Sequence, residues 1–204
     1  MGSQAGASSG GGRPGADDAA GTSRKVVASL QRWFYYFLLC GIIGFVYENL
    51  LDNLWYHHPW QWQGPLHGPW LVIYSFGGLA LLLALERFVS KKIKLGPIPI
   101  TPILTVILIF LIVCVVEYIG HWFLDTFFDF RPWDYTDKPF NLNGRICLED
   151  SLRFVVLGVL ELYVILPLVE RFLAKLTRRQ NLILFLVAAG LFVFDIIYSV
   201  IVMI

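Results

Sequence analysis

The sequence predicts an all-α membrane protein whose five helices cross the bilayer. Hydrophobic residues make up 57% of the 204-residue chain and charged residues only 15%, whereas a soluble domain carries about 25% charged residues. The apolar residues are gathered into long runs, and a helix needs roughly 20 of them to cross the hydrocarbon core. Such runs must be helical, because lipid offers no partner to an open backbone. The five expected spans are Trp33–Tyr56, Pro69–Arg87, Ile98–Leu124, Arg153–Glu170 and Leu182–Ile204.

The distribution of lysine and arginine predicts the orientation of these spans. Of the 16 basic residues, twelve fall before the first expected span, between the second and third, or between the fourth and fifth. The other four lie in the connections on the opposite side of the bilayer. Connections that face the cytoplasm carry the excess of basic residues. We therefore expect a multi-pass protein of the plasma membrane, with its N-terminus in the cytoplasm and its C-terminus outside.

Two features concern the organisation of the chain. Residues 1–30 are expected to form a disordered cytoplasmic segment, since their beginning is rich in Gly, Ser and Ala and shows no apolar periodicity. Residues 31–204 would then form one transmembrane domain. Within it, Leu85–Phe88 closes the second span much as Val169–Phe172 closes the fourth. The match indicates either a parallel two-helix repeat or a chance resemblance of short apolar strings.

Acidic residues inside the expected spans are the strongest functional signal. An ionisable group in the bilayer usually faces protein or a water-filled cavity. Glu48 and Asp52 are four residues apart and share one helical face, as do Glu117, His121 and Asp125. With the expected orientation, Glu48 and Glu117 both lie in the outward half of the membrane. A shared polar pocket open to the outside is therefore one interpretation.

Three other interpretations of these groups stay open. In the first, they are structural, and Arg145 or Arg153 pairs with a glutamate and fixes an outer loop to the helices. In the second, a carboxylate and His121 act as base and acid on a substrate. In the third, Glu48, Glu117 and His121 bind a metal, but the chain lacks an HExxH pattern, and no metal or other cofactor is predicted.

The outer loop of residues 125–150 is the most distinctive stretch outside the spans. It is longer than an ordinary connection, and long loops are often functional. Its mixture of aromatic, amide and charged residues predicts that it folds back over the helices. Together with the spans it supplies the candidate binding residues, which are Glu48, Asp52, Glu117, His121, Trp133, Asp134, Asn141, Asn143 and Arg145.

The order of several short motifs resembles a known family. The motifs are Gly44-Phe45-Val46-Tyr47-Glu48, Gly64-Pro65-Leu66-His67-Gly68-Pro69, Trp133-Asp134-Tyr135-Thr136 and Pro139-Phe140-Asn141-Leu142-Asn143-Gly144-Arg145-Ile146-Cys147-Leu148. Over roughly residues 33–172 the chain is similar to the ABC-transporter type IV permease family, also called CmpB-like. The eukaryotic transmembrane protein 229 group shares the tryptophan–aspartate–tyrosine loop. The resemblance implies a polytopic membrane protein with a permease role.

Absent motifs narrow the expected partners. No GxxxxGK[ST] phosphate loop is present, so transport driven by ATP would need a separate ATPase subunit. The net charge of +1 gives no indication of a nucleic-acid partner. The lipid bilayer, an ATPase subunit and a second copy of the chain are the candidate partners.

The leading functional hypothesis is a transporter permease with an outward-facing polar pocket. Glu48 and Glu117 would line the pocket, and Arg145 would be their counter-ion. One alternative is a membrane-embedded enzyme that acts on a lipid or lipid-linked substrate, with Glu117, His121 and Asp134 as the catalytic candidates. Another is a structural or assembly subunit of a membrane complex.

Overall fold

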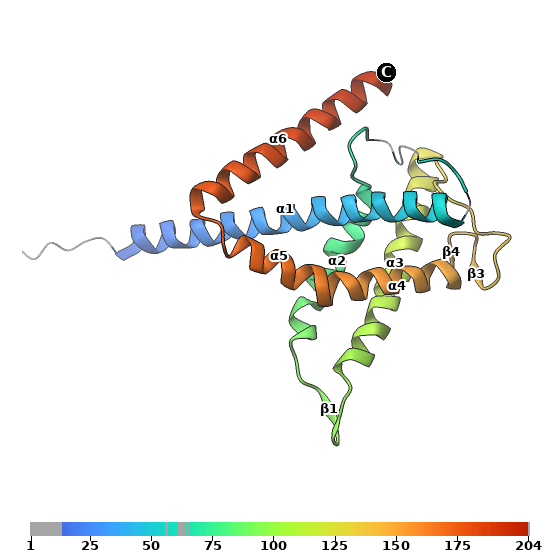
Figure 1. Ribbon diagram of the computed structural model, residues 1–204, viewed down its shortest axis with the longest axis horizontal. Helices are drawn as coiled ribbons and strands as arrows, with labels where there is room; N and C mark the ends of the chain where they lie inside the picture. Colours follow the sequence, from blue (N-terminus) through green and yellow to red (C-terminus); the bar gives the residue numbers. More distant parts are fainter. Residues whose placement is uncertain (1–13, 56, 61–63, 65, 204) are drawn as a thin grey trace, which may run out of the picture. The chain divides into compact units, whose positions relative to one another are not determined.

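The computed structural model describes residues 14–55, 57–60, 64 and 66–203 of the chain (Figure 1). Five of the described helical segments are long and apolar enough to cross a membrane. The prediction of an all-α protein with five spans is therefore confirmed. The spans are Val26–Leu51, Val72–Val89, Thr101–Phe128, Leu148–Leu173 and Arg178–Val202.

Helices form most of the described chain, and two short hairpins connect some of them. The hairpin between α2 and α3 pairs β1 (Lys94–Leu95) with β2 (Ile98–Pro99), and the one between α3 and α4 pairs β3 (Asn141–Leu142) with β4 (Ile146–Cys147). The helices are α1 (Pro14–Trp55), α2 (Val72–Val89), α3 (Thr101–Phe128), α4 (Leu148–Leu160), the π-helix η1 (Glu161–Ile165), α5 (Leu166–Leu173) and α6 (Arg178–Met203).

The chain divides into two units, and the boundary lies within α1, between Phe34 and Tyr35. α1 begins at Pro14, within the segment of residues 1–30 that was expected to be disordered. Proline is favoured at the first position of a helix, where an N–H would have no partner. Residues 15–30 contain no further proline and four alanines, and alanine is the best helix former. Glycine and serine are concentrated in residues 1–12. For residues 1–13 the expected disorder falls outside the described residues.

The fourth span is a continuous helical run that contains a π turn. Pro167 lacks an N–H, and its ring would clash with the carbonyl four residues earlier in a regular α-helix. The π-helix η1 widens the backbone immediately before this proline. Glu161 in the π turn accepts a hydrogen bond from the Cys40 thiol at 3.1 Å. Beyond the turn, Glu170 accepts one from the Tyr36 hydroxyl at 2.9 Å, so Glu161 and Glu170 are both bonded to α1.

Close packing of α1 against α2 positions the first candidate residue. A Cβ on Gly44 would lie 2.2 Å from the ring of Tyr74, which no real side chain could do. Small residues let helices approach this closely in lipid. The approach brings the Tyr74 hydroxyl to the Glu48 carboxylate, to which it donates a hydrogen bond.

α6 is joined to the segment that leads into α2. The indole N–H of Trp70 donates to Asp195 Oδ2 at 2.8 Å, and the His67 ring nitrogen Nδ1 lies 2.8 Å from the hydroxyl of Ser199. Asp195 is buried. This intramembrane acid therefore holds two segments of the chain together.

Candidate functional site

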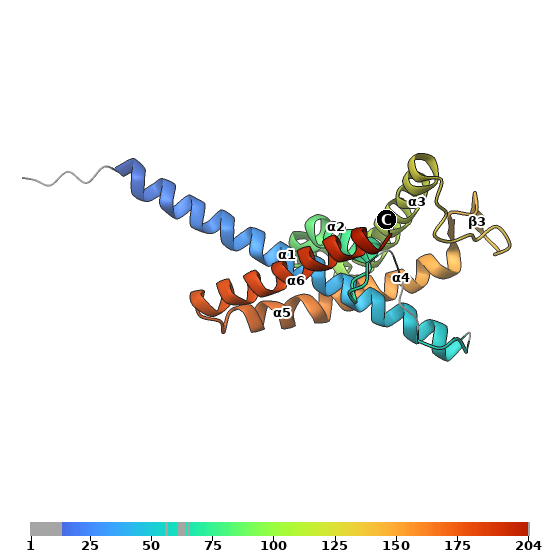
Figure 2. The same ribbon diagram turned by 90° about the horizontal axis from the view of Figure 1, so that it is seen from above.

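The long loop, residues 129–147 between α3 and α4, carries the β3–β4 hairpin (Figure 2). The two strands pair antiparallel, with Asn141 opposite Cys147. Asn143 and Gly144 form the turn, with φ angles of 55° and 66°. Glycine and asparagine adopt this left-handed region at the lowest cost. Side chains on either side of the turn are thereby directed back toward α3.

A chain of hydrogen bonds ties the long loop to α3. Nε2–H of His121 donates to the Trp133 carbonyl at 2.9 Å, and the Trp133 indole donates to the Arg145 carbonyl at 2.8 Å. The Arg145 guanidinium then donates to Asp125 Oδ2 at 3.1 Å and to the Tyr118 hydroxyl at 3.2 Å. The hydrogen bond that Arg145 donates to the Asp125 carboxylate raises the pKa of Arg145 above its ordinary value. As expected from its sequence, the loop folds back onto the helices.

The prediction that Arg145 is the counter-ion of Glu48 or Glu117 is wrong. Its guanidinium is paired with Asp125, which lies two turns beyond Glu117 along α3. Because the loop begins directly after α3, the acid nearest the end of that helix is the first that Arg145 reaches. Arg153 likewise forms ion pairs with residues near it in the sequence, namely Glu149 and Asp150 in the first turn of α4.

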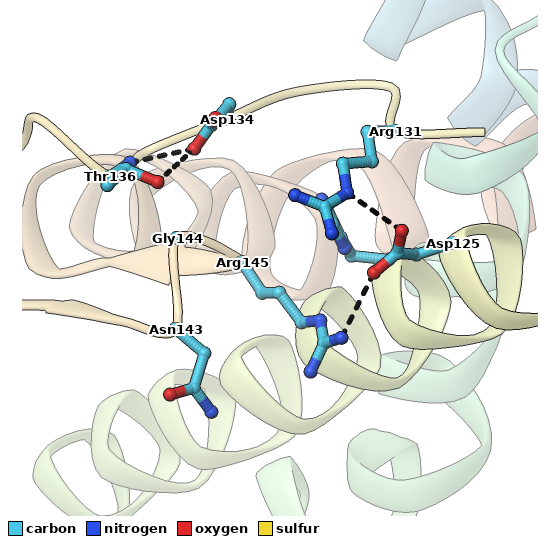
Figure 3. Close-up of a pocket in the computed structure, with 8 residues that line it drawn as sticks. Asp125, Arg131, Asp134, Thr136, Asn143, Gly144 and Arg145 are labelled. Carbon is cyan, nitrogen blue, oxygen red and sulfur yellow. Dashed lines mark hydrogen bonds and ion pairs between the residues drawn. The ribbon is translucent and has the colours of Figure 1, made fainter. Parts of the chain in front are cut away.

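A small polar pocket of about 30 Å³ lies between the long loop and α3 (Figure 3). Asp125 accepts from both Arg131, at 2.8 Å, and Arg145, so the charges around it are largely compensated. The volume of this small pocket suits one ordered water rather than a solute. Its lining residues are His121, Asp125, Arg131, Asp134, Thr136, Asn143, Gly144 and Arg145.

Asp134, in this small pocket, holds the shape of the loop. Its Oδ1 accepts hydrogen bonds from the backbone N–H of Thr136 at 2.9 Å and from the Thr136 hydroxyl. These bonds lower the pKa of Asp134 below its ordinary value. A carboxylate held in this way stays ionised at neutral pH, which suits a turn-forming role and not that of a general acid.

Glu117 and His121 are the most deeply buried candidates, with 6% and 3% of their surfaces exposed. Glu117 Oε2 accepts from the Ser151 hydroxyl at 3.3 Å. Glu117 Oε1 and His121 Nδ1 have no hydrogen-bond partner among the described residues. The two side chains therefore share a helical face without a hydrogen bond between them. The described residues also contain no group of three or more potential metal ligands.

A larger pocket of about 150 Å³ lies where α1, the long loop and α4 come together. Glu48, from α1, is half-buried at its wall and accepts the hydrogen bond from Tyr74. Three aromatic rings and an aliphatic side chain form the rest of the enclosure beside the charged groups. The lining residues are Tyr47, Glu48, Leu51, Tyr135, Lys138, Asp150 and Phe154.

Lys138 and Asp150 form the charged wall opposite α1. The Lys138 ammonium lies 2.5 Å from Asp150 Oδ2 and 5.1 Å from the centroid of the Tyr135 ring. Asp150 also accepts from Arg153 at 2.8 Å and from the Cys147 thiol at 3.0 Å. Burial, followed by the bond to Asp150, raises the pKa of Cys147 to about 11. This thiol is therefore a structural donor at neutral pH.

Tyr135 links the pocket to both predicted glutamates. Burial raises the pKa of its hydroxyl, and the negative charges of Glu117, Asp150 and Glu48 raise it further. The hydroxyl thus stays protonated among several carboxylates. Glu117 is not itself part of the pocket lining.

The structure therefore distributes the predicted residues between two places. Glu48 lines the larger pocket, while His121, Asp134, Asn143 and Arg145 line the small one. Asn141 and Trp133 are bonded within the loop, and the side chain of Asp52 lies outside the described residues. The candidate residues predicted from the sequence do not include six residues of the larger pocket, namely Tyr47, Leu51, Tyr135, Lys138, Asp150 and Phe154.

The missed residues differ in how far the sequence could have revealed them. Lys138 and Asp150 carry opposite charges at the two ends of the hairpin, which is a usable signal for an ion pair. Tyr47 and Phe154 sit in apolar helices, where nothing in the sequence separates a pocket aromatic from one that faces lipid.

Comparison with known proteins gives one match. A family model described as putative ABC-transporter type IV matches residues 35–200. No curated protein and no solved structure matches the chain.

Proposed function

The chain belongs to the putative ABC-transporter type IV family, and from this premise we propose that it is a membrane permease that binds a small polar solute in the larger pocket. The observation that carries the proposal is the placement of Glu48. This acid lies within a membrane span, half-buried, at the wall of a pocket of about 150 Å³. Acids at such positions mark substrate and ion pathways in membrane proteins.

The surroundings of the pocket support a binding role. Polar and charged groups converge on a space enclosed by aromatic side chains, which is the usual make-up of a small-molecule site. The long loop supplies Tyr135 and Lys138 to the pocket, so movement of this loop would change access to it. From the distribution of basic residues we expect this loop to lie outside the cell, so the solute would enter from there.

Energy for transport would come from a separate subunit. The chain contains no Walker phosphate loop, and its family name indicates an ABC transporter. We expect an ATPase subunit to copurify with the chain, and mass spectrometry would identify it.

Uptake by cells tests the permease role. Cells lacking the protein would be complemented with the wild type, with Glu48→Gln or with Asp137→Asn, and exposed to a panel of isotopically labelled polar solutes. Asp137→Asn is the matched control, because it also removes one negative charge, but from an exposed site in the long loop. We expect at least one solute to accumulate with the wild type and the control but not with Glu48→Gln.

Two results would count against the proposal. Equal uptake of every solute with and without the wild-type chain would contradict a permease role. If Glu48→Gln instead failed to accumulate as folded protein while wild-type uptake stayed absent, Glu48 would be structural, and the chain would fit an assembly subunit better.

A further inference from the structure

Two buried polar atoms on one face of α3 lack a hydrogen-bond partner among the described residues. They are Oε1 of Glu117 and Nδ1 of His121, and the two side chains are only 6% and 3% exposed. Buried polar groups are nearly always hydrogen-bonded, so each exception needs a physical explanation. Two exceptions one helical turn apart indicate a shared cause.

The hydrogen bonds that these side chains do make define what the two free atoms are. Nε2 of His121 lies 2.9 Å from the Trp133 carbonyl. Because a carbonyl only accepts, Nε2 carries a hydrogen, and Nδ1 of the neutral ring is an acceptor. Glu117 Oε2 accepts from the Ser151 hydroxyl at 3.3 Å, and Oε1 of an ionised carboxylate is an acceptor as well. Both free atoms therefore lack a hydrogen, and neither can satisfy the other.

A single proton would satisfy both atoms. Glu117 and His121 are four residues apart on α3, which places them about 6 Å apart along the helix axis. Side chains at this spacing on one helical face can reach each other. A proton on Oε1 turns the carboxyl into a donor toward Nδ1. A neutral acid beside a neutral ring also costs less in buried surroundings than a carboxylate beside an imidazolium.

Groups from α2, α4 and the long loop surround the two side chains. α2 packs against this part of α3 through Ile73 and Gly77, which carry no charge. Of the nearby groups, the carboxylates favour a proton at this place and the ammonium opposes it. His121 also lines the small pocket of about 30 Å³, so a water held there lies against its side chain. The titratable groups that act on Glu117 or His121 are Asp134, Tyr135, Lys138 and Asp150.

We infer that Glu117 and His121 form a buried proton-binding site, in which Glu117 Oε1 carries the proton and donates it to His121 Nδ1. Binding forms one O–H bond and breaks no covalent bond. The inference goes beyond the permease role and does not depend on it. Tyr135 and Asp150, which act on Glu117, also line the larger pocket, so the charge of the proton site influences that pocket.

Infrared spectroscopy tests the inference, because a protonated carboxyl has a carbonyl stretching band that a carboxylate lacks. Spectra of the full-length chain in lipid nanodiscs would be recorded at mildly acidic pH, where exposed carboxylates are ionised. We expect a carbonyl band from a buried acid. The band should shift when the medium is changed from H₂O to D₂O, since the bound proton is exchangeable.

Three variants then assign the band to the site. Glu117→Gln should remove it. Glu161→Gln, the same substitution at another buried acid within a span, is the matched control and should leave it in place. His121→Gln keeps a side-chain N–H that can donate to the Trp133 carbonyl but has no acceptor in the place of Nδ1. This variant should keep the band and shift it to higher frequency, because the Glu117 carboxyl loses its hydrogen-bond acceptor.

Two outcomes would overturn the inference. A spectrum that Glu117→Gln leaves unchanged would show that Glu117 carries no proton. A band that Glu117→Gln removes but that His121→Gln leaves at its wild-type frequency would show that His121 takes no part. If Glu117→Gln does not fold, the presence or absence of the shift in His121→Gln decides. None of these measurements uses a solute, so the uptake screen decides the permease role separately.

Discussion

Replacing Gly144 with alanine tests the construction of the long loop. Gly144 has a φ of 66°, and a Cβ there would lie 2.6 Å from Thr136 Oγ1 and 2.9 Å from Asp134 Oδ1. The left-handed backbone alone costs an alanine roughly 1–2 kcal/mol. Displacing the Thr136 side chain from Asp134 adds a further cost, since the Asp134 carboxylate then loses a donor. The free energy of unfolding should therefore fall by more than the backbone penalty of roughly 1–2 kcal/mol.

Gly96 supplies the matched control, because it shares the backbone strain without the collision. Its φ is 62°, but a Cβ at Gly96 would meet nothing within 4 Å. Gly96→Ala should therefore cost only the backbone penalty of roughly 1–2 kcal/mol. For a protein of this length each kcal/mol lowers the midpoint of thermal unfolding by about 2–4 °C.

A thiol-reactive fluorophore gives the readout, since Cys147 at the end of the loop is only 1% exposed when folded. Heating each variant in detergent micelles with the dye would report the temperature at which the buried thiols become accessible. Gly144→Ala should melt several degrees below Gly96→Ala. Equal shifts in the two variants would refute the contact of Gly144 with Thr136 and Asp134.

Three further predictions concern other groups of the molecule. Cys147 has a pKa of about 11 and is almost fully buried. At about neutral pH it should therefore react with iodoacetamide at least about tenfold more slowly than in the chain unfolded by detergent. Comparable rates of alkylation, measured by mass spectrometry, would contradict its burial. Because the folded-state pKa of Asp134 is lowered, its contribution to stability is fully present above the unfolded value and is lost as the pH falls through the folded one. Thermal midpoints should therefore decline in acid for the wild type, and less steeply for Thr136→Val, whereas parallel curves would argue against this linkage. Gly44→Ala should destabilise the protein by about 3 kcal/mol, because its Cβ would overlap the ring of Tyr74; size-exclusion chromatography should show less folded protein, and an unchanged monodisperse yield would speak against the α1–α2 packing.

The spans were predictable because their signal is a property of the sequence itself. A run of about 20 apolar residues needs no knowledge of its neighbours to be assigned to the bilayer. Burial of Glu117 and Asp195 followed from the same argument, since a charged group within a span has to face protein or water.

The sequence could not predict which side chains pair with each other, because the pairs depend on which helix faces lie near the loop. The sequence placed Asp125 on the face of Glu117 and His121, yet the position of the loop decided that Arg145 pairs with Asp125. Tyr47 and Phe154 reach one pocket from two helices whose relative rotation no local pattern encodes.

The π turn in the fourth span fixes the rotational phase of everything that follows it. Its wider backbone places one extra residue in the run without a full extra step of rotation, and each residue of an α-helix turns it by about 100°. Removing one residue from 161–165 would therefore restore a regular helix and leave the phase of α5 nearly unchanged, so Glu170 would still face Tyr36, to which it is now bonded. Removing one residue from the regular part of α4 would instead turn everything that follows by roughly that angle. The fourth span should consequently tolerate a single-residue deletion in the π turn better than one in α4.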